Sequence, residues 1–216
     1  MKIAVLGGSF NPIHIGHLAL ADEVCTSLGY DKILFIPTYN PPHKELNEMT
    51  APSVRVEMVK LACCDDERFE SEECEILRGG VSYTYDTLTY LYDKYSGVLD
   101  DKIGLIMGED LLSHFNLWYK AEEIASMSQL ILAVRPETAS EYEYKNKPKG
   151  KYADMAEGFD IAEDKLFKNA LFVNNPSLSV SSTDIRSRAA CGRSFRYLVP
   201  SKVFKYIKDK GLYGCN

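Results

Sequence analysis

The chain has 216 residues, of which 45% are hydrophobic and 26% charged, so it is long enough for one α/β domain with a sizeable core. Its 31 acidic and 25 basic side chains give a net charge of −6, which argues against a broad electrostatic surface for nucleic acid or anionic lipid. The N-terminal apolar stretch is too short for a signal peptide and no run approaches the length of a membrane span, so we expect a cytoplasmic protein with neither nucleic-acid nor membrane partners.

Along the chain, apolar runs alternate with segments of helical periodicity, which predicts a parallel sheet covered by helices on both faces. The expected strands are Lys2–Leu6, Lys32–Pro37, Phe69–Cys74, Lys102–Met107, Gln129–Val134 and Ala170–Val173. The expected helices are His14–Leu28, Ser53–Cys64, Thr84–Tyr95, Leu111–Phe115, Lys120–Ser126, Ser182–Ala190 and Pro200–Lys210. These elements predict a Rossmann-like α/β fold with an open parallel sheet, in a single domain over residues 1–216.

Three segments need separate comment. The helix expected from Ser53 follows Pro52, a helix-start residue, and places Val56, Val59, Lys60 and Cys63 near a common face. Residues 137–168 are charged and rich in tyrosine and lysine, and we expect a surface excursion there with some helix near Asp160–Lys168. The C-terminal part near 182–212 is expected to be helical.

Six cysteines lie at positions 25, 63, 64, 74, 191 and 215. None forms a C-x-x-C pair, so neither a metal site nor a disulfide framework has the expected spacing. We therefore expect reduced thiols, most of them buried, and no metal site built from protein side chains.

A glycine-rich turn with two histidines follows the first expected strand. It reads Gly7-Gly8-Ser9-Phe10-Asn11-Pro12-Ile13-His14-Ile15-Gly16-His17 and leads into a helix. Glycines let the backbone approach a ligand closely, and a helix N-terminus offers unpaired N–H groups and the positive end of its dipole to an anion. The turn therefore predicts a phosphate site, to which His14 and His17 add donors. An isolated H-x-x-H would also suit a capping and a packed histidine, or a zinc pair, although no third ligand is apparent nearby.

The predicted topology brings three distant loops together. In open α/β sheets, ligands bind beyond the carboxyl ends of the strands. The segment 7–17 follows the first strand, 108–110 follows Lys102–Met107, and 181–186 follows Ala170–Val173. We expect these loops to meet at one edge of the sheet.

These segments resemble a known family. Residues 7–17 resemble the G-x-F-x-P-x-H-x-G-H motif of the nucleotidyltransferase superfamily, and residues 180–186 resemble its C-terminal S-S-T-x-x-R element. The match narrows to the bacterial nicotinate mononucleotide adenylyltransferases through Pro41-Pro42-His43-Lys44, Ser82-Tyr83-Thr84-Tyr85-Asp86-Thr87-Leu88, Met107-Gly108-Glu109-Asp110-Leu111, Trp118-Tyr119 and Leu198-Val199-Pro200, which occur in the family's order. Ser9 and Asn11 stand where the family often has Thr and Asp, and both keep a hydrogen-bonding side chain.

The resemblance implies transfer of AMP from ATP to nicotinate mononucleotide, which gives deamido-NAD and pyrophosphate. It implies His14 and His17 as catalytic residues. The ATP and phosphate ligands would be Gly8, Ser9, Phe10, His14, His17, Lys44, Ser182, Thr183 and Arg186, and the mononucleotide ligands Thr84, Gly108, Asp110, Trp118 and Tyr119. Mg²⁺ is the expected cofactor, carried with the triphosphate of ATP.

Plainer interpretations stay open for several of these residues. Lys44 suits a solvated surface, the segment from Ser181 suits a helix cap, Trp118 suits the core, and Asp110 suits an N-cap. A related transferase for nicotinamide mononucleotide or another phosphorylated acceptor is the nearest alternative function, and a non-catalytic nucleotide-sensing module is the alternative of another class. The sequence leaves open whether the chain forms a homo-oligomer.

Overall fold

The computed structural model describes residues 1–41, 50–134, 164–174 and 178–215. These residues form a six-stranded parallel sheet in the order β3-β2-β1-β4-β5-β6. The strands are β1 (Ile3–Gly8), β2 (Lys32–Pro37), β3 (Phe69–Ser71), β4 (Gly104–Gly108), β5 (Gln129–Val134) and β6 (Leu171–Asn174). The α-helices are α1 (Ile15–Leu28), α2 (Pro52–Cys63), α3 (Cys74–Arg78), α4 (Thr84–Lys94), α5 (Glu109–Leu112), α6 (Ala121–Met127), α7 (Ser182–Ala190) and α8 (Ser201–Asp209). The predicted Rossmann-like fold is confirmed.

The strand order reverses next to β1. From β1 the chain moves outward to β2 and β3, then returns to place β4 on the other side of β1, with Ala4 opposite Gly104. The loops that leave β1 and β4 therefore diverge from neighbouring strand ends. This reversal is where open parallel sheets bind ligands.

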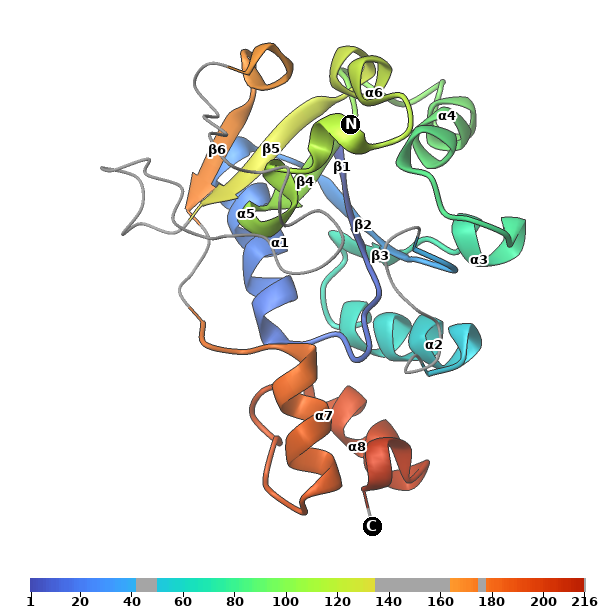
Figure 1. Cartoon of the computed structure of the whole chain (residues 1–216), viewed down its shortest axis with the longest axis vertical. Helices are drawn as coiled ribbons and strands as arrows, with labels where there is room; N and C mark the ends of the chain where they lie inside the picture. Colours follow the sequence, from blue (N-terminus) through green and yellow to red (C-terminus); the bar gives the residue numbers. More distant parts are fainter. Residues whose placement is uncertain (42–49, 135–163, 175–177, 216) are drawn as a thin grey trace.

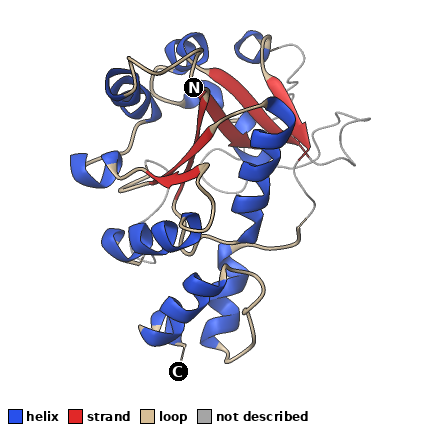
Figure 2. Ribbon diagram, turned by 180° about the vertical axis from the view of Figure 1, so that it is seen from behind, coloured by secondary structure: helices blue, strands red, loops and turns tan. Residues whose placement is uncertain are grey.

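Helices cover both faces of the sheet (Figures 1 and 2). Alternate residues of each strand point to opposite faces, so Ala4 and Leu6 of β1 belong to one core, and Ile3 and Val5 to the other. The first core lies against α1, α2, α7 and α8, and the second against α3, α4, α5 and α6. In Figure 1, α7 and α8 lie together at the end of the molecule that carries the C-terminus, below α1 and α2.

The third strand is shorter than predicted. It ends at Ser71, and α3 already begins at Cys74, the residue to which the sequence predicted the strand to run. The cause is Glu72, whose backbone N–H donates to the Phe35 carbonyl at 2.9 Å while its carboxylate accepts the Cys74 N–H at 3.0 Å. The carboxylate is buried and paired with Lys94 at 2.6 Å, so this turn depends on a contact that local sequence does not reveal.

Other predictions fare unevenly. The helix predicted at Leu111–Phe115 is replaced by α5 and a 3-10 helix at Phe115–Leu117. Most of the excursion 137–168 lies outside the described residues, but a 3-10 helix at Lys165–Phe167 buries Phe167 against Phe115. All six cysteines are free and four are buried, as expected. No helix in the described part of the chain is long and apolar enough to cross a membrane.

Candidate functional site

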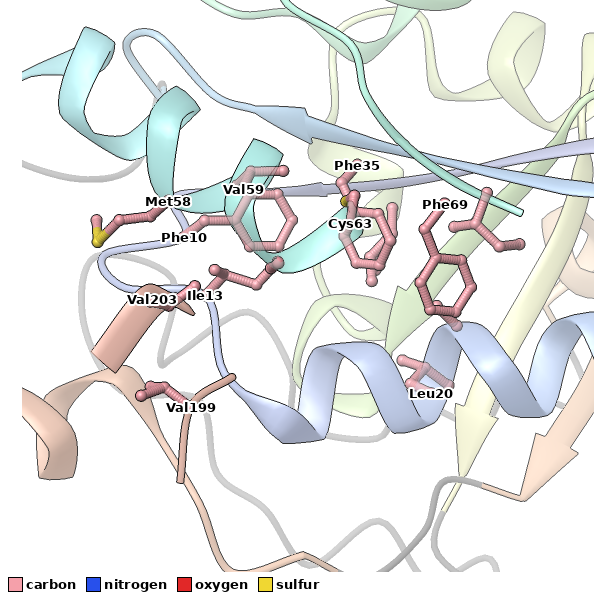
Figure 3. Close-up of a cluster of buried hydrophobic side chains, with 14 of the residues drawn as sticks. Phe10, Ile13, Leu20, Phe35, Met58, Val59, Cys63, Phe69, Val199 and Val203 are labelled. Carbon is pink, nitrogen blue, oxygen red and sulfur yellow. The ribbon is translucent and has the colours of Figure 1, made fainter. Parts of the chain in front are cut away.

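The turn between β1 and α1 is folded tightly around Phe10. This side chain is 2% exposed and its backbone has φ of +45°, a left-handed value that is uncommon outside glycine. A Cβ on Gly8 would lie 3.1 Å from the Phe10 ring, so the glycine makes room for it. Figure 3 shows Phe10 and Ile13 packed among side chains that include Val59 and Val203. The turn is therefore anchored in the first core.

The two predicted catalytic histidines lie together at the start of α1. His14 is the N-cap residue, and its backbone N–H donates to Nδ1 of His17 at 3.1 Å. The His14 and His17 rings stack with their centroids 3.7 Å apart. The Phe10 ring lies edge-on to the His17 ring, with a centroid distance of 5.1 Å. Because Nδ1 of His17 accepts a hydrogen bond, the neutral ring carries its proton on Nε2, which is left as a donor.

Burial keeps both imidazoles neutral. It lowers the pKa of His14 from 6.5 to about 4. Burial also lowers the pKa of His17 well below its ordinary value, and the neighbouring His14 lowers it further. At pH 7 the pair therefore offers neutral N–H donors rather than two charges.

Gly16 allows the C-terminal segment to reach this pair. A Cβ at this position would lie 3.0 Å from Cγ1 of Val180 and 3.2 Å from Nδ1 of His14. Both distances are tighter than nine in ten real Cβ contacts, so the glycine lets the segment before α7 pack onto the first turn of α1 without displacing these neighbours. In addition, the Ile15 N–H donates to the Leu198 carbonyl at 3.1 Å.

The start of α7 is tied directly to the turn. Ser182 donates its hydroxyl hydrogen to the Pro12 carbonyl at 2.8 Å, and Arg186 donates through Nη1 to the Asn11 carbonyl at 2.8 Å. Ser181 is the N-cap, accepting the Asp184 N–H at 3.1 Å, so the plain capping interpretation also holds. The loops after β1 and β6 thus meet, and Thr183 lies exposed beside Arg186.

The remaining strand end contributes Gly108 and Asp110. Gly108 is the last residue of β4 and the N-cap residue of α5, and Asp110 lies exposed in the first turn of that helix. Because β4 is the neighbour of β1, this turn leaves the sheet beside the glycine–histidine turn. Lys44, together with Pro42 and His43, lies outside the described residues.

The other predicted residues gather at the start of α4. Thr84 is the first residue of α4, so its backbone N–H belongs to the group that has no partner within the helix. The Tyr119 ring lies 4.9 Å from the Tyr83 ring and 6.0 Å from the Tyr85 ring, which brings the 118–119 segment against this helix end. Trp118 is partly buried, with its ring edge-on to Phe115 at 5.3 Å, so the plain interpretation that it packs on the second core holds.

Sequence reasoning missed the network that holds this helix end. Glu75 is buried, and its carboxylate accepts hydrogen bonds from the side chains of Thr87, at 2.8 Å, and Ser82. Ser82 Oγ in turn accepts the backbone N–H groups of Tyr39 and Asn40 at 3.1 and 3.4 Å. Burial raises the pKa of Glu75. The network joins the loop after β2 to the start of α4, and a glutamate in a five-residue helix gives no local signal of it.

In this parallel sheet, the glycine–histidine turn (residues 7–17) lies where the strand order reverses. A second helix, α7, packs its Ser182 and Arg186 against that turn. This combination defines a nucleotidyltransferase. Residues 5–188 match the cytidylyltransferase-like family model. Within that class, the chain belongs to the family of nicotinate-nucleotide adenylyltransferases.

Full-length relatives establish this membership. A protein of Borreliella afzelii named "Probable nicotinate-nucleotide adenylyltransferase" is 38% identical over 213 residues, which cover 99% of this chain and 97% of the relative. One of the same name from Treponema pallidum subsp. pallidum is 37% identical, with 99% of both chains covered. The solved structure of Plasmodium falciparum nicotinic acid mononucleotide adenylyltransferase complexed with NaAD superposes with a TM-score of 0.72 at 18% identity, over 100% of this chain and 98% of that one, and so shares the fold.

Proposed function

We propose that the protein transfers AMP from ATP to nicotinate mononucleotide in the cytoplasm, forming deamido-NAD and pyrophosphate for NAD biosynthesis. The observation that carries this proposal is the stacked, neutral His14–His17 pair at the start of α1, with Arg186 held against the same turn. Family membership supplies the substrates.

The chemistry needs no protein nucleophile. The acceptor phosphate is already an anion, so its oxygen attacks the α-phosphorus of ATP in line while the bond to pyrophosphate breaks. Catalysis then consists of positioning and of stabilising negative charge on the α-phosphate and the departing group. His17 donates through Nε2–H, His14 lies beside it, and Ser182, Thr183 and Arg186 hold phosphates over the cradle of Gly8, Ser9 and Phe10. Lys44, outside the described residues, is proposed as a further phosphate ligand.

Magnesium is expected to arrive with the nucleotide. The described residues hold no group of three His, Cys, Asp or Glu side chains placed to bind a metal ion, so a cage built by protein alone does not fit them. Bound to the triphosphate, Mg²⁺ would neutralise part of its charge.

The acceptor site is assigned to the start of α4. The Thr84 N–H and the positive end of the helix dipole would bind the pyridine carboxylate. Trp118 and Tyr119 would border the ring, and Gly108 and Asp110 would contact the sugar.

The first test compares acceptors. Wild-type protein should release pyrophosphate only when ATP and a mononucleotide are both present, and it should prefer nicotinate over nicotinamide mononucleotide at least about tenfold in kcat/KM. A carboxylate only accepts hydrogen bonds, whereas an amide would point a donor at the Thr84 N–H, and a charge-assisted bond contributes roughly 1.5–3 kcal/mol.

The outcomes separate the alternatives. Equal use of the two mononucleotides would remove the carboxylate assignment, and preference for another phosphorylated acceptor would identify a related transferase. ATP binding without pyrophosphate release for any acceptor would instead identify a nucleotide-sensing module. A nucleotidylated protein trapped with ATP alone would contradict direct transfer.

A second test concerns Arg186. The planar guanidinium bonds the Asn11 carbonyl while presenting further N–H groups, which the single ammonium of lysine does not reproduce. Arg186→Lys should therefore raise the KM for ATP roughly three- to tenfold although the charge is kept. Arg188→Lys, on the same helix and paired with Asp184, is the matched control and should leave ATP kinetics unchanged. Unchanged kinetics in both variants would leave Arg186 a purely structural role.

A further inference from the structure

Arg55 is a fully buried cation directly beneath the glycine–histidine turn. Its side chain has 0% exposure and is the largest fully buried side chain of the described residues. Its Nη1 donates to the Ser9 carbonyl at 2.7 Å, and its Nε donates to the Thr50 carbonyl at 3.1 Å. A charge is costly to bury, and burial lowers the pKa of Arg55 while Tyr213 and the buried Glu75 act to raise it. Its hydrogen bonds nevertheless go to two backbone oxygens, which calls for an explanation beyond packing.

The contact with Ser9 determines the direction of the next backbone N–H. In a planar trans peptide the C=O and N–H groups point in opposite directions. Because Arg55 holds the Ser9 carbonyl, the N–H of Phe10 in the same peptide points away from the Arg55 guanidinium. The left-handed φ of Phe10 belongs to the same arrangement, since non-glycine residues keep such values only where their surroundings impose them.

A second guanidinium and a tyrosine complete the support. Arg186 donates to the Asn11 carbonyl, and the Tyr213 hydroxyl donates to Oδ1 of Asn11 at 2.8 Å. Tyr213 is close enough to both Arg55 and Arg186 for the two charges to favour its ionised form, although burial raises its pKa to about 12. The carbonyls of Ser9 and Asn11 are thus held by two arginines that come from different helices.

We propose that Arg55 is a positioning residue for nucleotide binding: by holding the Ser9 carbonyl it aims the Phe10 N–H at the phosphates of ATP, and its buried charge adds positive potential under the turn. The inference rests on the proposed function for the identity of the nucleotide. Arg55 itself touches no substrate in this scheme, and it acts through the backbone of the turn.

The test measures binding and turnover in two variants. Arg55→Met keeps an unbranched side chain but has no hydrogen-bond donors. Arg55→Lys keeps the positive charge but lacks the planar guanidinium whose Nε and Nη1 reach two carbonyls at once. Affinity for a non-hydrolysable ATP analogue, measured by calorimetry, should fall at least tenfold in Arg55→Met and by a smaller factor in Arg55→Lys. The KM for nicotinate mononucleotide should change less than threefold. Arg68→Met, which removes a half-exposed arginine paired with Asp22 and Asp66, should change neither value.

Each result decides the matter. Wild-type affinity for the analogue in either folded variant would overturn the proposal, and equal losses for nucleotide and mononucleotide would show a general structural role instead. If Arg55→Met does not fold, a selective loss of analogue affinity in Arg55→Lys supports the proposal. A further outcome is that the wild-type protein fails to transfer AMP to nicotinate mononucleotide while the Arg55→Met variant still binds the analogue more weakly than wild type. In that case the proposed function fails and the role of Arg55 stands.

Discussion

Replacing His17 with alanine is expected to lower kcat about a hundredfold or more in a protein that still folds. The substitution removes the Nε2–H donor, and a donor to charge that develops in the transition state contributes roughly 3–4 kcal/mol. The effect should appear in kcat rather than in the KM for ATP, because the interaction strengthens as the α-phosphate gains charge. Steady-state pyrophosphate release, with thermal unfolding of the same sample, measures both quantities.

The structure supplies a control for this substitution. His17 also caps α1, since its Nδ1 accepts the His14 backbone N–H, and alanine removes that bond as well. Glutamine at this third helical position commonly accepts the same N–H, so His17→Gln should restore stability while leaving kcat low. A near-normal kcat in folded His17→Ala would remove His17 from the catalytic residues. Restored stability with a low kcat in His17→Gln would separate the cap from catalysis, whereas recovery of both would leave the glutamine NH2 group and the cap as joint explanations.

The sequence predicted best what is local. The turn of residues 7–17 could be recognised because strand, glycines and helix start follow one another within a single segment. The sheet was predictable because buried parallel strands appear as continuous apolar runs. The meeting of the loops after β1 and β6 followed from the fold class, and it is visible in the bonds from Ser182 and Arg186 to the turn.

The sequence predicted least where a long-range contact overrides a local pattern. On α2, Lys60 was placed near the common face with Val56, Val59 and Cys63, but it is half-exposed and paired with Glu73, while Arg55 is the buried charge. Helical periodicity gives no reason to bury an arginine. Its Thr50 partner is local, just before α2, but the Ser9 carbonyl that also receives it belongs to a turn 46 residues away in the sequence. Glu75 was missed for the same reason.

Acidification should destabilise the free protein through the histidine pair. The pKa of His14 is about 4 in the folded protein against 6.5 when unperturbed. Between these values the unfolded chain binds more protons than the folded one, so the contribution is fully present above about pH 6.5 and is lost as the pH falls toward 4. Lowering the pH from 7 to 5 should therefore reduce the free energy of unfolding by about 2 kcal/mol from His14 alone. His17 acts in the same direction, since its pKa is also lowered.

Denaturant unfolding at pH 7 and pH 5 measures this loss, and His14→Gln isolates its source. The glutamine variant cannot take up the proton at this position, so its stability should depend less on pH over this range than that of the wild type. A non-hydrolysable ATP analogue should also reduce the dependence, because phosphate anions beside the imidazoles raise their pKa and favour the protonated folded state. An equal loss of stability in His14→Gln and wild type would mean that neither the burial of His14 nor its stacking on His17 makes the folded protein acid-sensitive.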